Sequence, residues 1–132
     1  MYQFDKRVII VDDFYPEPLD VRELALSADY ETRGNHNYPG RNSLQPFWNN
    51  HLQAMLSSIT GDAVYPTPTS SCGHFRTTQA NDTSRQIIHF DPKPEQCWAG
   101  VIYLSLPQHY AGISSGTTLY RHTKSQMTVA PV

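Results

Sequence analysis

The sequence predicts an α+β fold in which N-terminal helices pack on an antiparallel sheet. Helical periodicity is confined to the first half of the chain, whereas β-branched and aromatic runs fill the second half. Pro66 and Pro68 lie in a Thr- and Ser-rich stretch that separates the two halves. Strands that follow helices, instead of alternating with them, favour an antiparallel sheet. Because 132 residues suit a single domain, we expect one domain over residues 1–132, with a helical support region at 1–62 and strands at 70–132.

The chain opens with a predicted strand and a short helix. Val8–Val11 is a β-branched run closed by two aspartates, which predicts a buried strand followed by a turn. Pro16 and Pro18 then stand where prolines open a helix. The apolar residues that recur at helical spacing after them are Leu19, Val21, Leu24, Ala25 and Ala28.

A loop and a second helix complete the first half. Residues 31–43 are rich in Gly, Asn and Pro, so we expect no regular structure there. From Leu44 to Ile59, apolar residues recur at i, i+3 and i+4, which predicts a helix that buries one face and carries no chemistry. Gly61 is placed to end this helix.

The second half has the composition of strands separated by turns, because β-branched and aromatic residues dominate its runs. The candidate strands are Cys72–Thr78, Gln86–Phe90, Trp98–Leu106 and Thr117–His122.

Charge and composition exclude several function classes. The net charge is −2, which offers no electrostatic footprint for nucleic acid or an anionic membrane, so we expect neither as a partner. No glycine-rich nucleotide-binding motif is present. The chain contains neither an export signal nor a run of about 18 apolar residues, and we therefore expect a cytoplasmic protein. Cys72 and Cys97 form neither a zinc nor a redox motif, so we expect ordinary reduced and packed thiols.

His89 and Asp91 form the most informative pattern in the chain. Residues i and i+2 of a strand project to the same face, so this imidazole and this carboxylate should lie side by side. Together they supply two of the three ligands of the 2-His-1-carboxylate triad that binds non-haem Fe(II). The alternative is a hydrogen-bonded pair in which Asp91 only fixes the imidazole tautomer.

The stretch from His89 to Leu104 resembles the Fe(II)/2-oxoglutarate-dependent dioxygenases, especially their prolyl-4-hydroxylase-like branch. In that family a His-x-Asp is followed by a turn and by an apolar strand ending in Tyr-Leu, here Tyr103-Leu104. The segment Ser115–Thr118 is similar to the Gly-Gly-x-Thr pattern of the family's next strand, and Ile9–Pro16 is similar to its opening strand and turn.

The resemblance implies an antiparallel double-stranded β-helix, a jelly-roll or cupin-like core whose first strands would occupy residues 70–132. It implies that His89 and Asp91 bind Fe(II), and that Tyr103 and Thr118 bind 2-oxoglutarate as the cosubstrate. The activity implied is hydroxylation of a small-molecule or peptide substrate, coupled to oxidative decarboxylation of 2-oxoglutarate. The resemblance assigns no further catalytic residue.

The chain departs from the family pattern after Thr118. The family carries a second iron-binding His and a 2-oxoglutarate-binding Arg or Lys further downstream. Only 14 residues follow Thr118, whereas about four more strands would complete the β-helix, so we expect an incomplete core. The explanation we favour for an incomplete core is that the chain is the front part of a longer protein.

Two alternatives to a longer protein stay open. In a shortened catalyst, His122 or His109 would supply the third iron ligand, and Arg121 or Lys124 would pair with the 2-oxoglutarate carboxylate. In the last case the chain is a non-catalytic jelly-roll module with a binding or structural role.

The remaining polar residues are assigned structural roles. We expect His74 to be hydrogen-bonded or at a rim, and His51 to lie on the polar side of the second helix. Arg76 and Arg85 are expected to be solvated charges, although either could approach an acidic substrate. Residues 37–41 could border the mouth of an active site.

Overall fold

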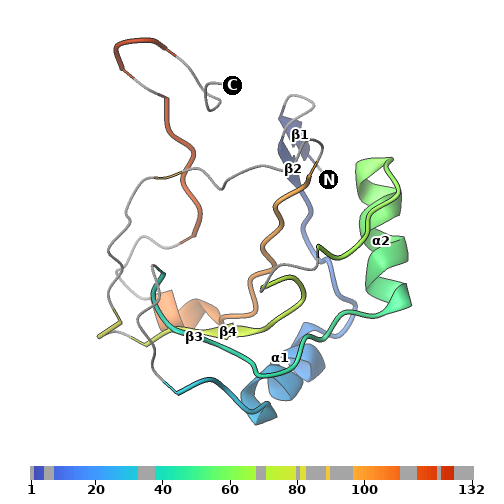
Figure 1. Ribbon diagram of the computed structural model, residues 1–132, viewed down its shortest axis with the longest axis vertical. Helices are drawn as coiled ribbons and strands as arrows, with labels where there is room; N and C mark the ends of the chain where they lie inside the picture. The colour runs from blue at the N-terminus through green and yellow to red at the C-terminus, as the bar shows by residue number, and fades with distance from the viewer. Residues whose placement is uncertain are drawn as a thin grey trace. The chain divides into compact units, whose positions relative to one another are not determined.

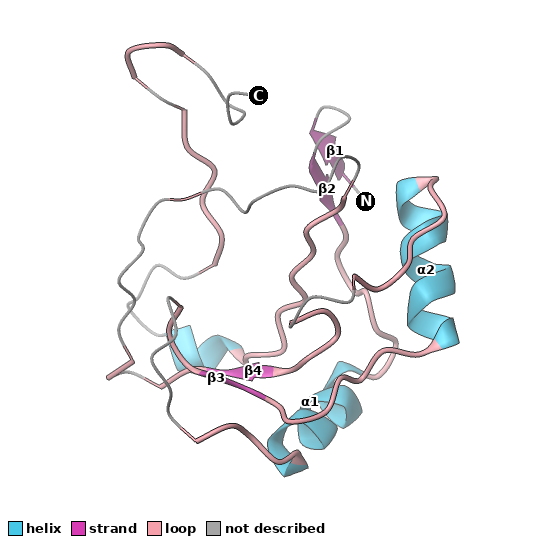
Figure 2. Cartoon of the chain, viewed as in Figure 1, coloured by secondary structure: helices cyan, strands magenta, loops and turns pink. Residues whose placement is uncertain are grey.

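The computed structural model describes residues 2–4, 8–32, 38–67, 71–79, 81–82, 89, 97–110, 116–121 and 123–126. The chain divides into two compact units, Met1–Ser84 and Arg85–Val132. Figure 1 traces the elements along the chain, and Figure 2 distinguishes its helices, strands and loops. Among the described residues, no helix is long and apolar enough to cross a membrane.

The first unit begins with a short antiparallel pair. Strand β1 (Tyr2–Phe4) pairs with β2 (Val8–Ile10), a partner that the sequence did not predict. The predicted strand is therefore confirmed over Val8–Ile10, but its predicted burial is wrong, because Ile10 is 45% exposed. Asp13 follows with a φ of 51°, a left-handed conformation that Asp tolerates in turns. The chain can therefore reverse direction directly after β2.

Helix α1 (Pro18–Ser27) confirms the predicted short helix. Proline stands in its first turn, where the missing N–H costs no hydrogen bond, and Asp20 complements the helix dipole there. Ala25 is buried, whereas Leu19 and Leu26 are 58% and 62% exposed. Apart from Ala25, the larger side chains of α1 contribute little to the core.

Helix α2 (Asn50–Thr60) begins six positions after the predicted start at Leu44. The Asn49 side chain caps it by accepting a hydrogen bond from Leu52 N at 2.8 Å, and Gly61, at φ 78°, ends it as predicted. The residues before Asn49 are not helical because their backbone amides bond elsewhere. Leu44 N donates to Asp29 O and Phe47 N donates to Gly73 O, each at 2.7 Å.

A second antiparallel pair holds the middle of the first unit together. Strand β3 (Arg41–Asn42) pairs with β4 (Arg76–Thr77), and the neighbouring Ser43 forms a bridge with Tyr30. The prediction of an irregular loop over 31–43 is therefore wrong at its end, and the strand predicted over Cys72–Thr78 is regular only at Arg76–Thr77.

The predicted double-stranded β-helix is wrong. The described residues form α1, α2, one short 3-10 helix η1 (Pro107–Tyr110) and the two-stranded antiparallel pairs β1–β2 and β3–β4, and these pairs neither curl nor close into a jelly roll. No strand occurs in the described parts of Trp98–Leu106 and Thr117–His122, and the predicted strand Gln86–Phe90 lies outside the described residues except for His89.

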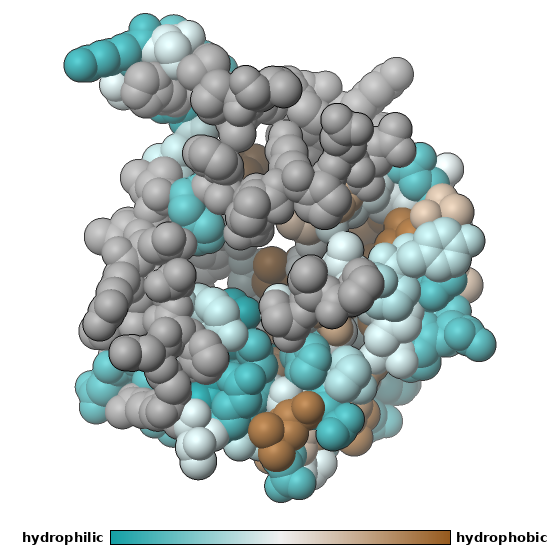
Figure 3. All heavy atoms as spheres, viewed as in Figure 1, coloured by the Kyte–Doolittle hydropathy of each residue, from teal (hydrophilic) through white to brown (hydrophobic). Residues whose placement is uncertain are grey.

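The physical reason lies in what strand propensity measures. A β-branched or aromatic residue favours a strand because it fits a pleated surface that is half buried and hydrogen-bonded to a neighbour. In the second unit Val101 is 67% exposed and Leu119 is 72% exposed, so these side chains do not meet that condition. On the face drawn in Figure 3, apolar residues likewise lie among polar ones.

Candidate functional site

Two residues of the predicted oxygenase motif meet in the second unit. The Tyr103 phenol and the Thr117 hydroxyl are hydrogen-bonded to each other, with either oxygen able to donate. Gly116 precedes Thr117 at φ 112°, and a Cβ added there would lie 4.0 Å from the Tyr103 hydroxyl. The Gly116-Thr117 backbone therefore approaches the end of the Tyr103 side chain.

Thr118, the residue predicted to bind 2-oxoglutarate, is exposed. The hydrogen bond to Tyr103 is made by its neighbour Thr117. Sequence reasoning missed Thr117 although it stands in the same Ser115–Thr118 motif, because two adjacent threonines leave open which one faces the tyrosine.

Of the two predicted iron ligands, only His89 lies among the described residues. His89 is exposed, and Asp91 lies outside the described residues. Among the described residues, no group of three His, Cys, Asp or Glu side chains is placed to hold a metal ion. An imidazole nitrogen paired with a carboxylate oxygen nevertheless remains the donor chemistry that suits Fe(II), so the residue types fit this metal.

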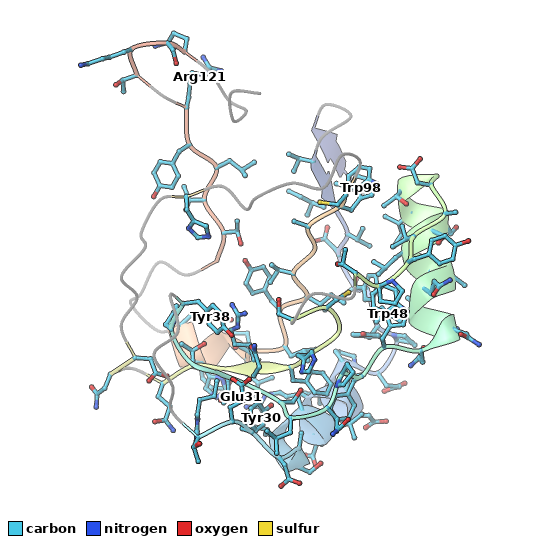
Figure 4. The ribbon with its side chains drawn as sticks, viewed as in Figure 1. Tyr30, Glu31, Tyr38, Trp48, Trp98 and Arg121 are labelled. Carbon is cyan, nitrogen blue, oxygen red and sulfur yellow. The ribbon has the colours of Figure 1, made fainter. Side chains whose placement is uncertain are left out.

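Of the two candidate third ligands, only His109 lies among the described residues. His122 lies outside the described residues, whereas His109 is exposed within η1, where its Nδ1 accepts a hydrogen bond from Leu106 N at 3.2 Å. Because Nδ1 accepts this bond, the neutral ring carries its proton on Nε2, so His109 could bind a metal only in the other tautomer, without the bond from Leu106 N. The two candidate carboxylate partners, Arg121 and Lys124, are both exposed, and Figure 4 labels the first of them.

The thiols differ from the expectation of packed cysteines. Cys72 is half-buried and Cys97 is exposed, and both are free.

A network of polar side chains, which sequence reasoning missed, lies around β3 in the first unit. Asn42 is 3% exposed, and its amide is engaged at both ends. Its Nδ2 donates to the Tyr38 hydroxyl at 2.8 Å, and its Oδ1 accepts from Arg76 Nε at 3.0 Å. The Arg76 guanidinium also lies over the Tyr38 ring, 3.9 Å from its centroid. We call Tyr38, Asn42 and Arg76 the Asn42 cluster; Figure 4 shows Tyr38 beside β3.

Ser43 continues this buried polar region. It is 1% exposed, and its Oγ donates to Gln45 O at 2.7 Å and accepts from Phe75 N at 3.1 Å. His74 Nδ1 donates to Ser43 O at 2.7 Å, because a carbonyl oxygen can only accept. The prediction of a hydrogen-bonded His74 is thus confirmed, and the bond fixes the tautomer that leaves Nε2 as the acceptor.

Two tyrosine phenols of the first unit have shifted pKa values. The Tyr30 hydroxyl donates to Ala25 O at 2.7 Å, which ties the residue to the end of α1. Burial raises the pKa of Tyr30 above its ordinary value, and the positive charge of Arg41 opposes part of that rise. Burial also raises the pKa of Tyr15. Both phenols therefore stay protonated at neutral pH, and that of Tyr30 is a structural hydrogen-bond donor.

Comparison with known proteins adds a family and no activity. Searches of curated proteins and of solved structures each found no match to this chain. One family model does match, and it covers residues 2–131. The chain therefore belongs to the family DUF6445, a family of unknown function.

Proposed function

We propose that this chain is an Fe(II)/2-oxoglutarate-dependent oxygenase domain of the hydroxylase type. The observation that carries the proposal is the hydrogen bond between Tyr103 and Thr117. These residues belong to two separate motifs of the resemblance, the strand ending in Tyr-Leu and the Gly-Thr segment after it. The contact brings these two segments together through Thr117, the variable position of the Gly-Gly-x-Thr pattern, and this closeness supports a shared cosubstrate site.

In this proposal His89 and Asp91 hold the iron. The neutral imidazole supplies one nitrogen, and the aspartate supplies one oxygen together with a negative charge that offsets part of the charge of the metal. His122 is the first candidate for the third ligand, and His109 is the second. Bound iron would supply the redox chemistry that activates dioxygen at the positions these ligands leave open.

The hydroxyls of Tyr103 and Thr117 bind and orient the cosubstrate. A phenol and an aliphatic hydroxyl each carry one proton and can each accept another. When one of the two donates to the other, the acceptor's own proton remains available for a carboxylate of 2-oxoglutarate. Thr118 would line the same site from the next position, and Arg121 or Lys124 would pair with the far carboxylate.

The overall reaction consumes 2-oxoglutarate and dioxygen, releases succinate and carbon dioxide, and adds one oxygen atom to the substrate. The substrate in this proposal is a small molecule or a peptide. The protein's own residues would bind and orient the cosubstrate.

An anaerobic calorimetric titration of the full chain with Fe(II) tests the proposal, followed by an assay of 2-oxoglutarate consumption in air. We expect one saturable iron site and slow formation of succinate even without substrate. His89→Ala and Asp91→Ala should each remove the iron site. His51→Ala is the matched control, because His51 is an exposed histidine on α2 and should leave iron binding unchanged.

The outcomes separate the parts of the proposal. Unchanged iron affinity in both ligand variants would overturn the metal assignment. Iron binding without any 2-oxoglutarate consumption would overturn the catalytic assignment. Loss of the site in His122→Ala but not in His109→Ala would identify the third ligand.

A non-catalytic binding module is the second candidate, and one observation favours it. Several large apolar side chains of the second unit are exposed, including Val101 at 67%, Leu119 at 72% and Tyr120 at 56%. Large apolar side chains that are exposed in one unit are candidates for contact with a binding partner. This candidate predicts no iron uptake, so the same titration distinguishes it from the oxygenase.

A further inference from the structure

The Arg76 side chain is held in one orientation by two contacts of different kinds. Its Nε donates to Asn42 Oδ1 at 3.0 Å, and its guanidinium lies over the Tyr38 ring at 3.9 Å from the centroid. Asn42 is itself fixed, because it is 3% exposed and its Nδ2 donates to the Tyr38 hydroxyl at 2.8 Å. The three residues of the Asn42 cluster therefore position one another.

These contacts leave one edge of the guanidinium available. Arginine carries N–H donors on Nε, Nη1 and Nη2, and the bond to Asn42 uses the donor on Nε. The Arg76 side chain is exposed, and within the part of the chain that the structure describes no carboxylate pairs with it. The fork of Nη1 and Nη2 donors is thus the part of this exposed side chain that the described hydrogen bond leaves unused.

From this arrangement we propose that Arg76 forms a carboxylate-binding site of the first unit. A planar carboxylate accepts two parallel hydrogen bonds from the Nη1 and Nη2 fork, and such bidentate pairs are stronger than single neutral bonds. A free arginine loses side-chain entropy when it binds, but Asn42 and Tyr38 already restrict this one. The site lies entirely within residues 38–76 and does not depend on the proposed iron chemistry.

The pairing of β3 with β4 supplies an internal control. Asn42 is opposite Arg76, and Arg41 is opposite Thr77, so the two arginines project to opposite faces of the same strand pair. Arg41 has the same charge and belongs to the same strand pair but is not part of the Asn42 cluster. A general attraction of anions to this unit would affect both arginines, whereas a built site would affect Arg76.

The test is an NMR titration of the full chain with sodium acetate, following the side-chain Nε–H signals of both arginines. Acetamide serves as the uncharged probe, and sodium chloride of equal ionic strength serves as the salt control. We expect the Arg76 signal to shift saturably with acetate and with neither control, and the Arg41 signal to stay in place. Equal shifts of the two arginines, or equal shifts with chloride, would overturn the site.

Two variants and a second anion test the assignment further. Arg76→Lys keeps the charge but removes the fork, so acetate should bind about tenfold more weakly, whereas Arg41→Lys should bind it as the wild type does. Equal affinity in these two variants would contradict the proposal. Should Arg76→Lys fail to fold, the wild-type titration still decides. Tighter binding of inorganic phosphate than of acetate at equal ionic strength would overturn the choice of carboxylate.

Discussion

Tyr103 and Thr117 are hydrogen-bonded through their side-chain hydroxyls although they lie 14 positions apart in the chain. A contact over this separation requires the backbone between them to turn back on itself. The short helix η1 lies within this interval. The pair is therefore the most direct place to test the proposed cosubstrate site by mutation.

Replacing Tyr103 with Phe should weaken 2-oxoglutarate binding. The ring remains, but one hydroxyl that donates to the cosubstrate is lost, so the KM for 2-oxoglutarate should rise about tenfold with a smaller change in kcat. Steady-state kinetics at varied 2-oxoglutarate concentration measures both quantities. Thr117→Val should have a similar effect, whereas Thr117→Ser should behave as the wild type. A larger effect of Thr118→Val than of Thr117→Val would shift the role to Thr118.

Alanine at Gly40 should be more destabilising than alanine at Gly61. Both glycines have a positive φ, 88° and 78°, so each substitution costs about 1 to 2 kcal/mol of backbone strain. A Cβ at Gly40 would also overlap the carbonyl oxygen of Thr77, whereas nothing lies within 4 Å of one at Gly61. We expect Gly40→Ala to lower the free energy of unfolding by about 1 to 3 kcal/mol more. Urea denaturation measures both variants, and equal losses would show that β4 moves away without cost.

Removing the Ser43 hydroxyl should destabilise the first unit. Ser43→Ala leaves the Phe75 N–H without its side-chain acceptor in a region that is 1% exposed at Ser43, and an unsatisfied buried amide costs about 1 to 3 kcal/mol. Ser27→Ala is the control, because the Ser27 hydroxyl bonds to Leu24 O in an exposed position. Thermal unfolding followed by circular dichroism compares the two. A similar midpoint for both variants would contradict the structural role of Ser43.

Alkaline pH should destabilise the fold partly through Tyr30. Burial raises the pKa of Tyr30 in the folded state above its ordinary value of 10.0, so above that pH the folded protein holds more protons than the unfolded chain. The free energy of unfolding therefore falls as the pH rises from 10.0 towards the folded-state pKa. Tyr30→Phe should show a smaller decline over this window, and also a loss of about 1 kcal/mol at neutral pH from the missing bond to Ala25 O.

The control for this pH effect is Tyr65→Phe. Tyr65 is 71% exposed, so its replacement should leave the pH dependence of urea denaturation unchanged. An identical alkaline decline in wild type and Tyr30→Phe would assign the effect to other groups, of which Tyr15 is the first to examine because burial raises its pKa as well.

The two helices could be predicted because their signals are local. Apolar spacing, the proline at the start of α1 and the glycine after α2 all act within a few residues of where they stand. The start of α2 could not be predicted, since Leu44 and Phe47 donate their backbone N–H groups to Asp29 and Gly73. Those partners are distant in sequence, and they take residues with helical spacing out of the helix.

The buried polar residues could not be predicted for a related reason. Asn42 and Ser43 stand in a stretch of turn-forming residues, and nothing in their own neighbourhood indicates burial. Their burial depends on hydrogen bonds to Tyr38, Phe75 and Arg76, which the fold supplies from elsewhere. At the candidate site the resemblance identified Tyr103, but strand periodicity could not decide between the two threonines that follow Gly116.

The burial of Asn42 helps to determine the register in which β3 and β4 pair during folding. Successive residues point to opposite sides of a strand, so a slip of one position would move Asn42 to the other side. Its amide would then lose the hydrogen bonds to Tyr38 and Arg76. An apolar side chain of similar size would tolerate both registers, because hydrophobic contacts are not directional. The buried amide therefore favours the observed register of β3 and β4 over a slipped one.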